Sequence, residues 1–210
     1  MHEHAHDRLT EAQAGELLAT LQAPVTAFDC GTLCAPGNGG VPVCCHAPSV
    51  LPVLYKAELA LLQKRTDLWR RHVPTGVDAG LRARARSCDV FAVCKGHTAC
   101  ERDNRALACR TFPFEPYLDH DDVFVGIVFA FEFASLCPLI TSDHAIEPQF
   151  VAECCAMWRQ LFAFDAAERA FYVGCSRTLR RQFGRRGERI PVFTERGVVA
   201  MPTRRGTRRR

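Results

Sequence analysis

Two groups of closely spaced cysteines constrain this chain more than any other feature of its sequence. Twelve of the 210 residues are cysteine. The first group consists of Cys30, Cys34, Cys44 and Cys45. The second consists of Cys88, Cys94, Cys100 and Cys109. Glycine, proline and asparagine between the thiols favour turns, and residues 30–48 and 88–114 lack the apolar periodicity needed to bury much surface. We therefore expect metal–thiolate bonds to order these loops, because such bonds offset the entropy lost when the backbone is fixed.

Thiolate chemistry narrows the choice of metal. Soft thiolates are the ligands of zinc and of iron-sulfur clusters, and short spacings allow one loop to wrap around the metal. Free cysteines that only pack in a core are the alternative, but free thiols in exposed loops would be reactive. Because adjacent residues seldom both reach one metal comfortably, one of Cys44 and Cys45 is expected to bridge to a second site or to pack.

The amino-terminal residues and the apolar runs indicate the compartment. The opening M-H-E-H-A-H-D leads into a polar, amphipathic stretch without the apolar region of a secretory signal, so we expect a cytoplasmic protein. Thiols stay reduced in the cytoplasm, and a disulfide framework is not expected. The longest apolar run, residues 123–140, contains Glu132 and many Val, Ile and Phe residues, which favours a buried strand over a membrane span. No membrane contact is expected.

A short motif in the second group points to a family. Cys109 begins the sequence C-R-T-F-P, which ends at Pro113, and Cys100 lies nine residues before Cys109. With the spaced and vicinal cysteines of the first group, this pattern resembles the YkgJ-type cysteine-cluster family, described as a zinc- or iron-chelating domain. The resemblance spans residues 30–138, where Cys137-Pro138 looks like the family's later Cys-Pro element. The chain departs from the pattern at Ala106, where proline is usual, and in its longer interval between the two cysteine pairs of the first group.

The resemblance implies a pool of metal ligands large enough for one cluster with spare thiols or for two sites. These ligands are Cys30, Cys34, Cys44, Cys45, Cys94, Cys100, Cys109 and Cys137. Because the thiols outnumber the four that a structural zinc needs, we expect an iron-sulfur cluster, with 4Fe-4S preferred and zinc as the alternative. Cys88 has no counterpart in the family pattern. His97 could replace a thiol, donate a hydrogen bond to sulfur or be an ordinary loop histidine.

Three functions remain open. The first is an iron-sulfur protein with an electron-handling or structural role; the second is a zinc-stabilised module that binds a protein or peptide partner. The third is a cluster-dependent enzyme that modifies proteins or peptides, since the cysteine motif is also similar to that of flagellin lysine methylases. The glycine-rich segment Gly37–Gly40 neither follows a predicted strand nor opens a helix, so it indicates a turn rather than a nucleotide site. Arg105 and Arg110 are expected either to neutralise thiolates or Asp103, or to face solvent.

Apolar spacing outside the loops predicts a mainly α domain with a small β element. Residues 8–21, 49–68, 147–164 and 166–183 have helical periodicity, and residues 122–133 favour a strand or hairpin. Cys154, Cys155 and Cys175 fall on the apolar sides of the last two helices. We expect these three thiols to pack in or near the core and not to bind metal.

The charge distribution divides the chain into a domain over residues 1–183 and a basic flexible tail over residues 184–210. From Arg177 onward the sequence has twelve arginines but only the acids Glu188 and Glu195. A solvated tail with weak, salt-sensitive attraction to nucleic acid or to an acidic partner is expected.

Overall fold

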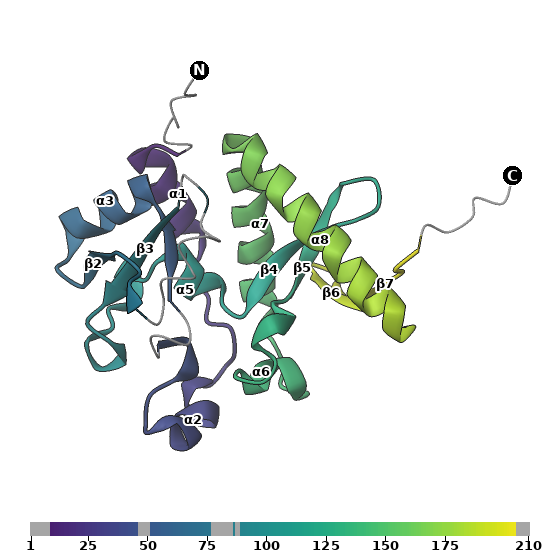
Figure 1. Ribbon diagram of the computed structural model, residues 1–210, viewed down its shortest axis with the longest axis horizontal. Helices are drawn as coiled ribbons and strands as arrows, with labels where there is room; N and C mark the ends of the chain where they lie inside the picture. The colour runs from purple at the N-terminus through teal and green to yellow at the C-terminus, as the bar shows by residue number, and fades with distance from the viewer. Residues whose placement is uncertain (1–8, 46–50, 77–85, 87–88, 205–210) are drawn as a thin grey trace, which may run out of the picture.

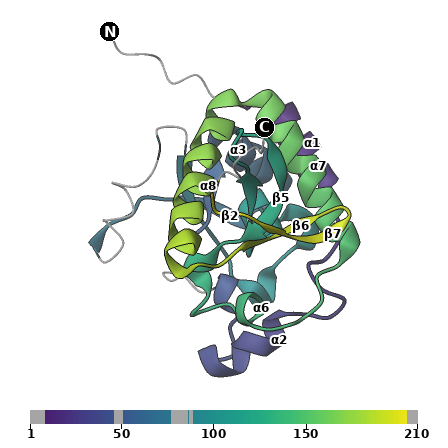
Figure 2. The same cartoon turned by 90° about the vertical axis from the view of Figure 1, so that its right-hand side faces the viewer.

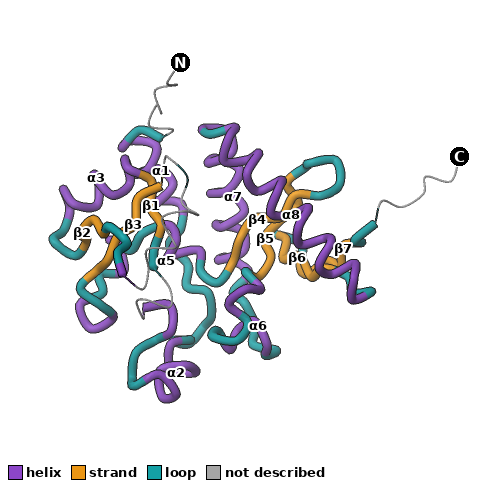
Figure 3. The backbone as a smooth tube through the Cα atoms, in the orientation of Figure 1, coloured by secondary structure: helices purple, strands orange, loops and turns teal. Residues whose placement is uncertain are grey.

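The computed structural model describes residues 9–45, 51–76, 86 and 89–204. These residues form a mixed α/β fold in which helices and two small antiparallel sheets alternate along the chain (Figure 1). The sequence prediction of a mainly α fold is confirmed only in part, because the β content exceeds the one small element expected. The tube view shows the strands gathered in two places, β1 to β3 on one side and β4 to β7 on the other (Figure 3).

The first sheet has the strand order β1-β3-β2, with β3 (Asp89–Cys94) pairing antiparallel to both neighbours. Its outer strands are β1 (Val53–Tyr55) and β2 (Trp69–His72). The helix α3 (Lys56–Arg65) connects the outer strands and packs against α1 (Glu11–Thr20). A capping box at Thr10 begins α1, in which the threonine side chain accepts from the backbone N–H of Gln13.

The second sheet has the order β4-β5-β6-β7. Its strands are β4 (Phe114–Leu118), β5 (Phe124–Phe129), β6 (Ile190–Thr194) and β7 (Gly197–Met201). The long helices α7 (Pro148–Phe164) and α8 (Ala166–Arg186) pack against it, and α7 also contacts α1, which joins the two halves of the molecule (Figures 1 and 2). One apolar core runs through both halves and includes Leu17, Leu62, Ile127, Phe150 and Leu161.

Short elements connect these layers and carry most of the cysteines. The short α-helices are α2 (Gly31–Cys34), α5 (Leu107–Thr111) and α6 (Pro138–Thr141). The 3-10 helices are η1 (Ala35–Asn38), η2 (Val43–Cys45), η4 (His97–Ala99), η5 (Arg102–Asn104) and η6 (Phe131–Phe133). The turn expected at the glycine-rich segment is present, since Gly39 and Gly40 both have positive φ.

The structure confirms the first, third and fourth predicted helices as α1, α7 and α8, and the predicted strand as β5. The helix expected over residues 49–68 is corrected: its amino-terminal part is β1, and helix begins only at Lys56. Tyr55 has extended φ and ψ there, and the Glu58 side chain accepts from its backbone N–H. Strand β3 was also missed, because the sequence around Cys94 shows a short apolar run without a clear period.

The expected flexible tail over residues 184–210 is corrected for the part that the structure describes. Helix α8 continues to Arg186 and ends at Gly187, whose φ of 70° is the left-handed conformation that favours glycine. Strands β6 and β7 then form a hairpin, in which Ile190 and Val192 are fully buried. Residues 205–210 lie outside the described residues.

Within the described ranges no helix combines the length and the apolar character that crossing a bilayer requires.

Candidate functional site

All eight cysteines proposed as ligands lie within or next to short elements rather than in the middle of long ones. Cys30 precedes α2, and Cys34 is its last residue. Cys44 and Cys45 lie in η2, and Cys94 ends β3. Cys100 follows η4, Cys109 lies in α5, and Cys137 precedes α6. Six separate segments of the chain therefore supply thiols to one region, and every described cysteine is a free thiol.

Electrostatic interactions connect all eight of these thiols. The interacting pairs are Cys30 with Cys34, Cys137 with Cys30 and Cys34, Cys44 with Cys30, Cys45 and Cys109, and Cys109 with Cys45, Cys94 and Cys100. The sulfur atoms of Cys44 and Cys45 lie 4.0 Å apart. In the described part of the chain, no three Cys, His, Asp or Glu side chains meet closely enough to bind one metal ion together. The described thiols are thus neighbours around one region.

A cavity of about 520 Å³ occupies that region. Six of the eight thiols line it, namely Cys30, Cys44, Cys45, Cys94, Cys100 and Cys109. His97 also lines this cavity, so the loop histidine lies in the same region as the thiols. The volume falls within the range of about 300–1,000 Å³ that small-molecule and cofactor sites occupy.

Arg105 is the arginine that lies beside the thiols of this cavity. Its Nε donates to the Cys100 sulfur at 3.0 Å, as one of the sequence hypotheses required. Burial opposes the charge of Arg105, but this bond and the thiolates of Cys100, Cys45 and Cys109 raise its pKa. The pKa of Cys45 falls to about 7, first because of its hydrogen bond with the Cys44 thiol and also because Arg105 lies near. Burial raises the pKa of Cys30, Cys109 and Cys137, and neighbouring thiolates add to the effect.

Arg110 acts differently from the expectation. Its guanidinium donates to backbone carbonyl oxygens, including that of Asp103 at 2.7 Å and that of Leu18 at 3.1 Å, rather than to sulfur or to a carboxylate. It therefore ties the segment that carries Cys109 to the end of α1. Such bonds hold the ligand segments in place without touching the thiols.

Glu58 of α3 supports the same segment from the other side. Its carboxylate accepts from the backbone N–H of Leu107 at 2.6 Å, at the start of α5, and from that of Tyr55 at 3.2 Å. Glu58 is buried, and burial raises its pKa to about 7. A buried carboxylate thus caps the helix that holds Cys109, which no sequence pattern revealed.

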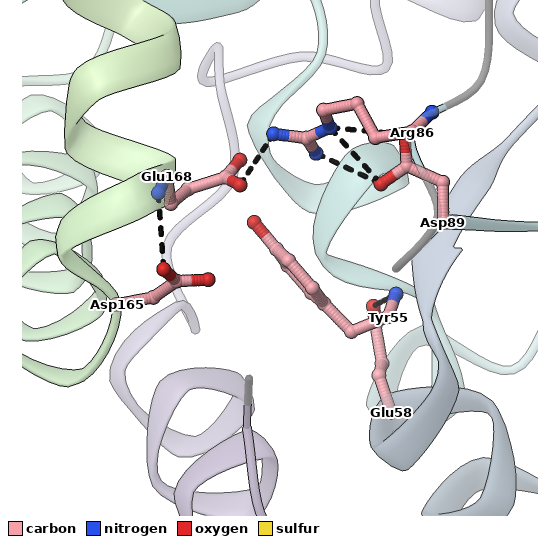
Figure 4. A network of polar contacts seen from close by, with 6 residues as sticks. All are labelled: Tyr55, Glu58, Arg86, Asp89, Asp165 and Glu168. Carbon is pink, nitrogen blue, oxygen red and sulfur yellow. Dashed lines mark hydrogen bonds and ion pairs between the residues drawn. The ribbon is translucent and has the colours of Figure 1, made fainter. Parts of the chain in front are cut away.

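The far wall of the cavity is polar and was not foreseen from the sequence. Arg86 lies between Asp89 and Glu168 and binds both carboxylates, while the Tyr55 hydroxyl points toward Glu168 (Figure 4). Glu115 of β4 also lines the cavity, and its pKa rises to about 8, mainly through burial and also through Glu132. These groups come from β1, β3, β4 and α8, so only the tertiary fold brings them together.

The three described cysteines of α7 and α8 do not line this cavity. Cys154 and Cys155 of α7 are fully buried in the core, as predicted, and Cys175 of α8 is half-buried. Cys88 lies outside the described residues, as do the histidines of the amino terminus.

Comparison with known proteins gives no match: no protein-family model, no curated protein and no solved structure is significantly similar to this chain.

Proposed function

We propose that the cysteine-lined cavity holds an iron-sulfur cluster, 4Fe-4S by preference, bound by thiolates drawn from Cys30, Cys34, Cys44, Cys45, Cys94, Cys100, Cys109 and Cys137. The observation that carries the proposal is the convergence of six thiols and Arg105 on one cavity. The resemblance of the C-R-T-F-P segment to the YkgJ-type family agrees with it. The cluster would serve an electron-handling or structural role.

The arrangement of the thiols favours a cluster over a single zinc ion. Zinc draws four ligands to one point at about 2.0–2.3 Å. In an iron-sulfur cluster, several irons and sulfides stand between the cysteines, so the thiolates surround a volume. Six thiols that surround one cavity fit the second geometry better. A zinc-stabilised interaction module with a protein or peptide partner is the alternative that metal analysis would decide.

The electrostatics of the cavity also suit bound iron ions. Thiolates repel one another, so burial and mutual proximity keep most of them protonated when nothing positive lies between them. Iron and Arg105 would together supply the missing positive charge. When bound, the cluster would provide one-electron redox chemistry or a fixed structural link. Arg105 would hold the Cys100 sulfur, and Glu58 and Arg110 would hold the backbone around Cys109. Reduced thiols of this kind suit the cytoplasm, which we propose as the compartment.

The experiment is Cys109→Ser on full-length protein purified without oxygen. Iron, sulfide and zinc are measured, and the visible absorption of the protein is recorded. We expect the wild type to contain iron and sulfide and to absorb in the visible, and the variant to lose most of both. Cys155→Ala is the matched control, because that thiol is buried in α7 and does not line the cavity, and it should keep the full metal content. Stoichiometric metal in Cys109→Ser, or zinc alone in the wild type, would overturn the iron-sulfur proposal.

A second function, a cluster-dependent enzyme that modifies proteins or peptides, is favoured by the far wall of the cavity. Glu115 lines this wall together with the aromatic side chains of Tyr172 and Trp158, and a bound ammonium group would lower its raised pKa and keep it ionised. Acidic and aromatic groups together suit an ammonium group such as that of lysine, as the similarity to flagellin lysine methylases suggests. If this is correct, Glu115→Gln should keep the metal content but weaken binding of a lysine-containing peptide. A protein that binds no such peptide at millimolar concentration would refute it.

A further inference from the structure

The carboxyl-terminal half of α8 forms one side of a second concave surface, far along the helix from Glu168. It is an open groove of about 600 Å³, bounded also by the turn between β4 and β5 and by the residues after β7. Figure 2 shows this end of α8 beside the β6–β7 hairpin. The lining residues include Arg177, Arg180, Arg181, Arg185, Arg204 and His120. No carboxylate is among the described residues that line the groove.

Three of these arginines form a stripe along the helix. Arg177, Arg181 and Arg185 are spaced by four residues, so they lie on one face with a rise of about 6 Å between successive side chains. Arg181 and Arg185 are exposed. Arg177 is compensated by Asp122, 3.0 Å away. Like charges four residues apart destabilise a helix, so the stripe does not serve the stability of α8 itself.

The floor of the groove holds its charge in a fixed position. Arg180 is only 5 % exposed, its Nη1 donates to the carbonyl oxygen of Leu118, and its guanidinium lies 5.7 Å from the centre of the Tyr117 ring. Beside it, Gly184 lies next to Thr203, whose side chain would stand in ordinary van der Waals contact, 3.4 Å, with a Cβ at position 184. Arg204 follows Thr203, lines the groove from the segment after β7, and is exposed to solvent.

The chemistry of the lining indicates the kind of ligand. All its cationic residues apart from His120 are arginines, and the planar guanidinium binds phosphate through two parallel hydrogen bonds. Protein-binding surfaces usually have an apolar centre with aromatic anchors. Apart from Gly184 and Thr203, the described residues that line this groove are all arginine or histidine. A row of cations without apolar contacts suits a polyanion that carries a charge at regular intervals.

We propose that this groove binds the phosphate backbone of a nucleic acid, without reading its bases. The inference does not depend on the metal proposed above. It also differs from an attraction through a loose basic tail, because the groove is built from the ordered residues of α8 and of the segment after β7. Contacts confined to phosphates predict similar affinity for different sequences and a strong dependence on salt.

The test measures the fluorescence anisotropy of labelled single-stranded RNA, single-stranded DNA and duplex DNA with the full-length protein, between about 50 and 200 mM salt. The groove variant is Arg181→Gln/Arg185→Gln. We expect its affinity to fall at least about tenfold, with a salt slope for duplex DNA smaller by about 2. The control variant, Arg186→Gln/Arg196→Gln, removes the same charge from two exposed arginines outside the groove, and it should lose less than about twofold. Comparing the three ligands shows which nucleic acid the groove prefers.

Several outcomes would overturn the proposal. Equal losses in the groove and control variants would mean that net charge alone attracts the ligand. Loss of binding when the chain is ended at Arg204 would assign the effect to residues 205–210. Tighter binding of a poly-glutamate peptide than of every oligonucleotide would assign the groove to an acidic protein. Because both substituted arginines are exposed, we expect the variant to fold; if its thermal unfolding shifts, the single change Arg181→Gln replaces it and should lose about threefold or more.

Discussion

Replacing Arg86 tests how the two halves of the molecule are joined. Arg86 precedes β3, and its guanidinium bridges Asp89 of that strand and Glu168 of α8 (Figure 4). The distance from Nη2 to Oδ1 of Asp89 is 2.9 Å, and from Nε to its Oδ2 is 3.0 Å. The guanidinium also lies 4.4 Å from the centre of the Phe171 ring. Burial opposes its charge, but hydrogen bonds to the two carboxylates raise the pKa of Arg86, which keeps it a cation.

The expected cost follows from the burial of its partner. The Glu168 side chain is 1 % exposed and that of Asp89 is 8 % exposed. Arg86→Met keeps an apolar stem of similar length but removes the cation that bridges these two buried carboxylates. Breaking a buried ion pair by removing one partner costs about 3–5 kcal/mol. Since the Arg86 side chain is itself 23 % exposed and Tyr55 still faces Glu168, we expect about 3 kcal/mol.

Urea denaturation followed by circular dichroism measures this free energy of unfolding. The matched control is Arg159→Met, because Arg159 pairs with Glu195 at 2.7 Å but both side chains are about half exposed, at 51 % and 45 %. An exposed pair contributes about 0–1 kcal/mol, so the control should change little. Adding Glu168→Gln to Arg86→Met should recover part of the loss, since it removes the buried charge left behind. A cost for Arg86→Met no greater than that of the control would refute the reasoning.

The remaining predictions concern the core thiols and the buried acids. Cys154→Ala and Cys155→Ala should each lower the free energy of unfolding by about 1 kcal/mol, measured in urea, and should leave the metal content unchanged, because each removes a small buried group that does not line the cavity. Loss of metal in either variant would show that the ligands are misassigned. Folding raises the pKa of Glu115 to about 8, so the native state holds a proton that the unfolded state releases above its ordinary pKa of 4.5. Stability should therefore fall as the pH rises from about 5 to about 8, and Glu115→Gln should reduce this fall; an unchanged pH profile in the variant would contradict the prediction.

The long elements of this fold were predictable because their apolar residues repeat with a helical period. In α7, Phe150, Cys154, Trp158 and Leu161 follow that period and are all buried. Strand β1 was not predictable, since three residues carry no period and the neighbouring leucines belong equally well to a helix. The hairpin of β6 and β7 was obscured by the arginines around it. Ile190 and Val192 alternate as a half-buried strand requires, but the charge count outweighed this short signal.

Part of the candidate site could be predicted from local sequence spacing, and part depends on tertiary packing that no local pattern shows. Sequence spacing was enough to group the cysteines, because a run of thiols in turn-rich segments is rare without a ligand to bind. It could not find Glu58 or Glu115, which reach the cavity from α3 and β4. A single acidic residue on an otherwise apolar element has no local signature, since its burial depends on which elements pack around it. Arg86 was missed because its partner Glu168 belongs to α8, which only the tertiary fold brings near it.

The segment from Phe28 to Cys45 shows why the cysteines matter to the order of this fold. Gly31 and Val43 are its only buried residues, whereas Phe28 is 41 % exposed. Fixing the backbone costs about 1–2 kcal/mol per residue, and two buried residues cannot offset that cost over this length. Local hydrogen bonds, such as that from the Val43 N–H to the Cys34 sulfur at 3.4 Å, contribute little net free energy. Leu33 and Cys30 are partly buried against the core, and a metal shared by the thiols of this segment with Cys94 of the first sheet and Cys109 of α5 would anchor it further to both. Metal removal should therefore release this segment first, before the helices α7 and α8, and hydrogen exchange would detect the order of release.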